Sequence, residues 1–234
     1  MDGNSEQRRA FLAGVGIVSG GLLVAGGRAL ALPEKEKEDK GEEISPVEDL
    51  MREHGALNRV LLIYDEELRR LRASGDTDMA VLAAAADIIR RFVEDYHEKL
   101  EEDHLFPRFR KAGKLVPLVD TLLEQHRAGR RLTEQIRALA VNGTLKDEAK
   151  RRQLSEALQS FVHMYRPHEA REDTVLFPAL RAIVSPHEYD ALGEQFEKKE
   201  DELFGEDGFF KVVEQVAELE KKLGIYELSQ FTPR

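Results

Sequence analysis

The chain has 234 residues, of which 41% are hydrophobic and 34% charged, a composition typical of a soluble protein with an apolar core. Its 45 Asp and Glu residues outnumber its 35 Lys and Arg residues, which argues against general nucleic-acid binding. The absence of Cys excludes disulfide scaffolds, thiolate zinc sites, Cys-ligated iron–sulfur clusters and cysteine nucleophiles.

The first 31 residues differ from the rest and predict an export signal. A paired Arg8-Arg9 precedes an apolar, glycine-rich stretch from Phe11 to Gly27, and the small-x-small sequence Ala29-Leu30-Ala31 follows. The arginine pair and the weakly hydrophobic core resemble the twin-arginine signal, which implies export of an already folded protein to a periplasmic or other extracytoplasmic location. If the segment stays uncleaved, it anchors the protein to the membrane, and we expect membrane contact only through it.

A charged linker is expected over residues 32–45, because the stretch from Pro33 to Glu43 has no large apolar residue to bury. Folded structure should begin at Ser45-Pro46-Val47-Glu48, a capping box with proline in the first helical position. A second capping box, Ser185-Pro186-His187-Glu188, predicts the start of a later helix.

Residues 46–183 read as four long helices with short connections. Apolar residues recur every three and four positions, as on the buried face of a bundle helix. Breaks are predicted at Gly75-Asp76, from Gly113 to Pro117, and at Asn142-Gly143. The fold class expected is all-α: an up-down antiparallel four-helix bundle over 46–183, with extra C-terminal helices in 184–234.

Polar residues interrupt the apolar faces of three helices. His54 lies in the first face, His126 in the third, and His168 and Glu172 in the fourth, one turn apart. Burying such a group without a partner costs about 1–3 kcal/mol, so the imidazoles require a common explanation.

An internal repeat supplies that explanation. Residues 96–107 (YHEKLEEDHLFP) align with residues 167–178 (PHEAREDTVLFP), and His54 aligns with His126. Each half therefore contributes a lone His and, further along, a His-x-x-x-Glu. Duplication of a helical hairpin places four imidazoles and two carboxylates around one centre, which predicts a dinuclear metal site. Nitrogen and oxygen ligands of this kind suit iron, manganese or zinc.

At these residues the chain resembles the hemerythrin family, in particular its bacterial His-His-Glu cation-binding branch. The resemblance covers about Pro46 to Ile183 and implies a non-haem di-iron centre with Glu101 and Glu172 bridging, although other divalent metals are possible. It also implies reversible binding of O2, or reactions with O2, peroxide or NO; the redox partner is not indicated. The metal ligands implied are His54, His97, Glu101, His126, His168 and Glu172.

The chain departs from the oxygen-carrying hemerythrins, which have five histidines with two on the third helix; here that helix offers only His126. Two octahedral ions offer about 12 positions, and the implied ligands with one bridging oxygen fill about 10. The open positions favour chemistry over simple oxygen carriage. Asp173 is a rival to Glu172 as second bridge, and the repeat favours Glu172.

Other polar residues near the predicted centre have alternative roles. His104 follows the face of Glu101 and could be a ligand or a packing residue. His163 faces away from the fourth seam unless Pro167 kinks the helix. Glu94 and Tyr165, one turn before His97 and His168, are candidate hydrogen-bond partners of the ligands.

Two further functional hypotheses remain. A ferritin-like oxidase needs Glu-x-x-His on two helices, whereas Glu94 to His97 and Glu101 to His104 lie on one helix. A metal-dependent sensing or interaction bundle without catalysis would use the C-terminal helices as a docking surface.

Overall fold

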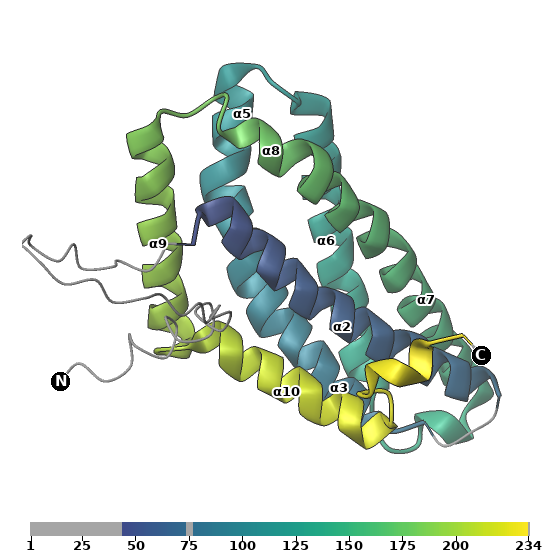
Figure 1. Ribbon diagram of the computed structural model, residues 1–234. Coiled ribbons are helices and arrows are strands. Elements are labelled where there is room, and N and C mark those ends of the chain that lie inside the picture. The colour runs from purple at the N-terminus through teal and green to yellow at the C-terminus, as the bar shows by residue number, and fades with distance from the viewer. Residues whose placement is uncertain (1–43, 74–76, 234) are drawn as a thin grey trace, which may run out of the picture. The chain divides into compact units, whose positions relative to one another are not determined.

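The computed structural model describes residues 44–73 and 77–233 (Figure 1). The predicted export signal and nearly all of the predicted linker lie outside this part of the chain. The described residues form helices and no strand, which confirms the predicted all-α class. None of these helices combines the length and the apolar character needed to cross a membrane.

Four helical rods form the bundle. The first is α2 (Pro46–Arg72), and the third is α6 (Val116–Leu139). The second runs without a break from residue 79 to 112 through α3 (Met79–Ile88), η1 (Ile89–His97), α4 (Glu98–Leu100), η2 (Glu101–Leu105) and α5 (Phe106–Ala112). The fourth comprises α7 (Glu148–Arg171), η4 (Glu172–Leu176) and α8 (Phe177–Leu180), after a short 3-10 turn, η3 (Thr144–Lys146). The first rod packs on the fourth, and α6 packs on both α7 and α3.

Both predicted capping boxes form N-terminal caps. The Ser45 hydroxyl accepts a hydrogen bond from the Glu48 amide at 3.3 Å and starts α2. The Ser185 hydroxyl accepts one from the Glu188 amide at 3.2 Å and starts α9 (Pro186–Phe204). The break between α5 and α6 occurs at Gly113, whose left-handed φ of 64° suits glycine.

The internal repeat extends to the backbone, because each half has a π-helical turn at the same place. The amide of Phe106 bonds to the carbonyl of Glu101, five residues back, and the amide of Phe177 bonds to that of Glu172. The prolines that follow each phenylalanine lack an N–H and would clash with the carbonyl four residues back, which disfavours a regular α-helical turn there. Such π-turns occur frequently at functional sites.

The C-terminal helices pack on the outside of the bundle (Figure 1). After α9 come α10 (Gly208–Leu223) and a short 3-10 turn, η5 (Leu228–Phe231). The Arg59 guanidinium pairs with Glu220 at 2.5 Å, and Arg70 donates a hydrogen bond to the Leu223 carbonyl at 2.6 Å. Because these contacts join α10 to α2, the extension belongs to the same compact unit, residues 45–234.

Candidate metal centre

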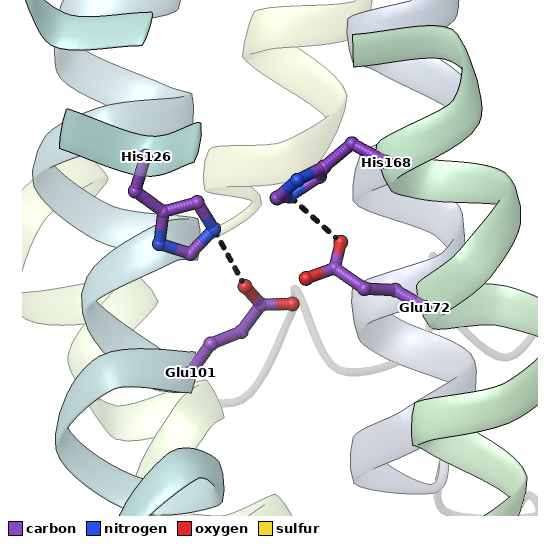
Figure 2. Close-up of side chains that lie close together, drawn as sticks. All are labelled: Glu101, His126, His168 and Glu172. Carbon is purple, nitrogen blue, oxygen red and sulfur yellow. Dashed lines mark ion pairs between the residues drawn. The ribbon is translucent and has the colours of Figure 1, made fainter. Parts of the chain in front are cut away.

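The structure brings the six predicted ligand residues together in the middle of the bundle, each at most 4% exposed. They come from all four rods: His54 from α2, His97 and Glu101 from the second rod, His126 from α6, and His168 and Glu172 from the fourth. Their ligand atoms form two adjoining groups that could each hold an ion. One group is Glu101, His126, His168 and Glu172 (Figure 2), and the other is His54, His97 and Glu101.

The histidines form a first pair, His54 and His97, and a second pair, His126 and His168. Each central carboxylate lies between one histidine of each pair. Oxygens of Glu101 lie 3.6 Å from Nε2 of His97 and 3.3 Å from Nε2 of His126. An oxygen of Glu172 lies 3.4 Å from Nε2 of His54 and 3.1 Å from Nε2 of His168. This placement suits two carboxylates that contact two ions.

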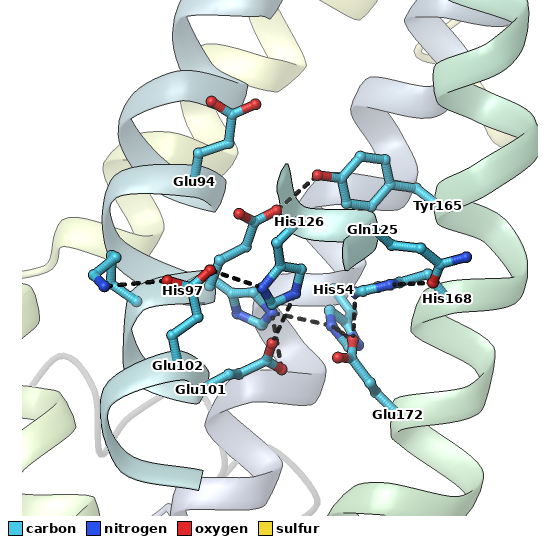
Figure 3. A network of polar contacts seen from close by, with 12 residues as sticks. His54, Glu94, His97, Glu101, Glu102, Gln125, His126, Tyr165, His168 and Glu172 are labelled. Carbon is cyan, nitrogen blue, oxygen red and sulfur yellow. Dashed lines mark hydrogen bonds and ion pairs between the residues drawn. The ribbon is translucent and has the colours of Figure 1, made fainter. Parts of the chain in front are cut away.

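All four imidazoles present Nε2 to the centre, because Nδ1 of each faces an oxygen acceptor outside it. Figure 3 shows two of these acceptors, Glu102 beside His126 and Gln125 beside His168. The Nδ1 contacts are His54 to Asp173 at 2.7 Å, His97 to Glu53 at 2.6 Å, His126 to Glu102 at 3.1 Å, and His168 to Gln125 at 2.9 Å. A carboxylate or amide oxygen accepts only from Nδ1–H, so the Nε2 lone pair is free to bind a metal.

The polar atoms at the centre fit a metal better than a metal-free core. Both oxygens of Glu101, both oxygens of Glu172 and Nε2 of His126 are buried and make no hydrogen bond. Unsatisfied buried polar groups are rare in native proteins. In addition, the Nε2 atoms of the first pair face each other at 3.0 Å, so one of them must hold a proton. Cations between these groups would satisfy every one of these atoms.

The electrostatics of the centre show where protons lie without a metal. Burial and the adjacent Glu172 raise the pKa of Glu101 well above its usual value. Burial alone would raise the pKa of Glu172, but His168 and His54 outweigh it and hold that pKa well below its usual value. Despite burial, Asp173 and Glu172 raise the pKa of His54 to about 10. Metal binding must therefore displace protons from His54 and Glu101.

Aromatic rings close the centre from its surroundings. The Phe106 ring stacks on His126 and the Phe177 ring stacks on His54, with 5.4 Å between centroids in both cases. These two phenylalanines occupy equivalent positions in the repeat, so each Leu-Phe-Pro sequence shields a histidine of the other half. Together with the burial of all six residues, these contacts place the centre in the protein interior, where electrostatic interactions are stronger than at the surface.

Several predicted residues lie outside the group of six. Asp173, the rival bridge, contacts Nδ1 of His54 instead of the central carboxylates. His104 packs edge-on against Phe196 of α9. His163 is exposed, as its position off the fourth seam indicates, because α7 continues through Pro167 and does not swing the residue inward.

The two candidate hydrogen-bond partners of the ligands, Tyr165 and Glu94, make different contacts. The Tyr165 hydroxyl donates to Glu98 at 2.6 Å, and its ring lies edge-on to His168. Glu94 instead pairs with Arg90 at 2.7 Å.

Sequence reasoning missed Glu53, Glu102 and Gln125 as residues that hold the imidazoles from outside, and it considered Asp173 only as a bridging ligand. Glu53 and Gln125 immediately precede the two lone histidines, while Glu102 and Asp173 immediately follow the two central glutamates. Glu53 and Gln125 accept from the second histidine of their own half, whereas Glu102 and Asp173 accept from the lone histidine of the other half. The repeat was the available signal, because these four residues align pairwise just as the ligands do.

Comparison with known proteins places this arrangement in a family. The family described as the hemerythrin HHE cation binding domain matches residues 45–180, and a second, overlapping match covers residues 117–223. An uncharacterized protein of Mycobacterium tuberculosis and one of Mycobacterium bovis are each 48% identical to the chain over 190 residues, covering 81% of this chain and 74% of theirs. No solved structure matches the chain.

Proposed function

This chain belongs to the hemerythrin HHE cation-binding family, and we propose that it holds two iron ions and reacts with O2 or a related small molecule such as peroxide or NO. The proposed ligands are His54, His97, Glu101, His126, His168 and Glu172. The observation that carries the proposal is the convergence of four inward Nε2 atoms on two carboxylates that lack hydrogen-bond partners.

The first pair would hold one ion and the second pair the other, with Glu101 and Glu172 in contact with both. The outer acceptors fix each imidazole in the tautomer that binds metal and keep the ring oriented. Phe106 and Phe177 stack on the rings of His126 and His54 and limit the movement of these imidazoles. When bound, the two irons would supply redox chemistry with a diatomic or peroxide ligand.

The side chains around the centre also influence where protons are held. Nδ1 of His54 and His97 face carboxylates, so these rings can become more basic as charge develops at Nε2. Burial raises the pKa of Glu53, the partner of His97, to about 8, which places it near neutrality.

The reactivity is tested by mixing reduced, anaerobic iron-loaded protein with O2, peroxide or NO in a stopped-flow spectrophotometer. We expect a saturable absorbance change in the wild type and its loss in His126→Ala and His168→Ala, which also retain less iron. His187→Ala is the matched control, because His187 is exposed in the first turn of α9. Equal iron content in all of these proteins would refute the ligand assignment. A loaded centre inert to all three molecules would refute the reactivity.

The inert outcome would favour the second candidate function, a metal-dependent sensing or interaction bundle. One observation supports it: α10 is joined to α2, the helix of His54, by the Arg59–Glu220 ion pair. A change in metal occupancy at α2 would then be transmitted to the C-terminal helices. Metal-dependent protection of α10 in hydrogen exchange, in the absence of reactivity, is the expected result for this candidate.

A further inference from the structure

The repeat is broken at the outer acceptors of the second histidine in each half. His97 donates to the carboxylate of Glu53 at 2.6 Å, but its counterpart His168 donates to the neutral amide oxygen of Gln125 at 2.9 Å. A carboxylate partner makes a metal-bound imidazole a stronger electron donor than an amide does. The first pair therefore has two carboxylate partners, and the second pair has one.

The one carboxylate partner of the second pair, Glu102, is compensated by neighbouring cations. Glu102, the partner of His126, forms ion pairs with Arg130 at 2.8 Å and with Lys99 at 3.1 Å. Its counterpart Asp173, about a third exposed at 35%, has no Lys or Arg within ion-pair distance among the described residues. Asp173, the acceptor of His54, thus has no cation beside it among the described residues, whereas Glu102, the acceptor of His126, has two.

A third difference between the halves also makes the surroundings of the second pair less negative than those of the first. Arg130 pairs with Glu98 at 2.8 Å, whereas Asn58, which occupies the equivalent position in the first half, donates a hydrogen bond to Glu169. Both glutamates are at least 97% buried and immediately follow a proposed ligand histidine. Of these residues, those around the first pair supply the carboxylates of Glu53, Asp173 and Glu169, while those around the second supply the carboxylates of Glu98 and Glu102 and the guanidinium of Arg130.

We infer that the two metal positions are unequal: the position of His54 and His97 binds its ion first and more tightly, and Gln125 and Arg130 weaken the position of His126 and His168. The inference rests on the proposed function, since it assigns an order of filling to the same centre. Each difference concerns residues that touch the imidazoles or their partners. Altering such a partner changes metal affinity by about 10–100-fold.

The experiment is an anaerobic titration of metal-free protein with Fe2+ against a chromophoric ferrous chelator. The wild type should bind two ions in two steps, with dissociation constants that differ by at least about 10-fold. Gln125→Glu restores the repeat and should tighten the second step by about 10-fold or more, while Glu53→Gln should weaken the first by a similar factor. The control is Gln159→Glu on the exposed face of α7, the same substitution away from the centre, which should change neither step.

The position of the tight step is tested separately with ligand variants. His168→Ala should retain the tight step and lose the weak one, whereas His54→Ala should lose the tight step. The reverse pattern, or two steps of equal affinity in the wild type, would overturn this inference and leave the proposed function standing. Failure of the wild type to bind Fe2+ at all would overturn the proposed function and the inference with it. Circular dichroism of each variant establishes that it is folded. If Gln125→Glu does not fold, the weakened first step expected in Glu53→Gln still tests the inference.

Discussion

Removing the metal should strongly destabilise the bundle without abolishing its helices. Without an ion, Glu101, Glu172 and Nε2 of His126 remain buried and lack hydrogen bonds. Each such group costs about 1–3 kcal/mol, so the three together cost roughly 3–9 kcal/mol. This is a large part of the roughly 5–15 kcal/mol by which a typical domain is stable.

That cost predicts a measurable shift in melting temperature. For a domain of this size, about 1 kcal/mol shifts the midpoint by roughly 2–4 °C. The low end of the range therefore gives a loss of about 6–12 °C on chelation, to which the binding energy of the metal itself adds. The apolar faces of the four rods remain, so we expect the helical circular dichroism signal to persist at low temperature.

The metal-free and metal-loaded proteins should respond to pH in opposite directions. Burial raises the pKa of three glutamates from 4.5 to about 8, and the pKa of His54 rises from 6.5 to about 10 through Asp173 and Glu172, against the effect of burial. The glutamates are Glu53, Glu98 and Glu169. A raised folded-state pKa gives stability that is lost as pH rises through that value, so metal-free protein should lose stability between pH 6.5 and 8.5.

The lowered pKa of His126, about 4, acts in the other direction but only below 6.5, outside this window. In the loaded protein the ligands must be deprotonated, so metal affinity rises over the same interval and falls in acid. Thermal melts followed by circular dichroism, with and without chelator at pH 6.5 and 8.5, measure all four states. Superimposable melting curves would mean that these residues are not buried around a metal.

Two further predictions concern other parts of the chain. Gly129→Ala should destabilise the protein by about 1–3 kcal/mol in a denaturant melt, because the added Cβ would lie 2.0 Å from the Tyr165 hydroxyl. Gly55→Ala, also inside a helix but with no side-chain neighbour within 4 Å, should stabilise it by up to about 1 kcal/mol, and equal effects of the two changes would contradict the packing at Tyr165. We also propose that the chain is exported by its twin-arginine-type segment, so Arg8→Lys with Arg9→Lys should abolish export in cell fractionation; unchanged fractionation, or an intact Met1 in the exported protein, would contradict this.

The main features of the bundle could be predicted because they depend on local signals. The apolar spacing defined the rods, and both serine capping boxes start helices as expected. The π-turns at Glu101 and Glu172 were not predicted, although the proline six residues after each glutamate disfavours a regular α-helical turn there. Helical periodicity assumes a regular 3.6-residue turn and cannot represent a turn that widens around a proline.

The centre was predictable to the extent that its residues interrupt an apolar face. His54, His126 and His168 were conspicuous for that reason, and the repeat added His97 and Glu101. The outer acceptors were missed because glutamates beside a helix seam usually face solvent, and only tertiary packing shows that Glu53 is 2% exposed. For His163 the helical periodicity was the better guide, since the proline one turn later leaves α7 continuous and the residue is exposed.

The most direct test of the account is the metal content of protein purified from its native compartment, measured together with its optical spectrum. The account predicts about two iron ions per chain, from two adjoining groups of ligands that share Glu101. It also predicts absorption that disappears on chelation and returns when iron is restored. Protein that contains no iron, or that binds a single ion even with iron in excess, would contradict the dinuclear centre.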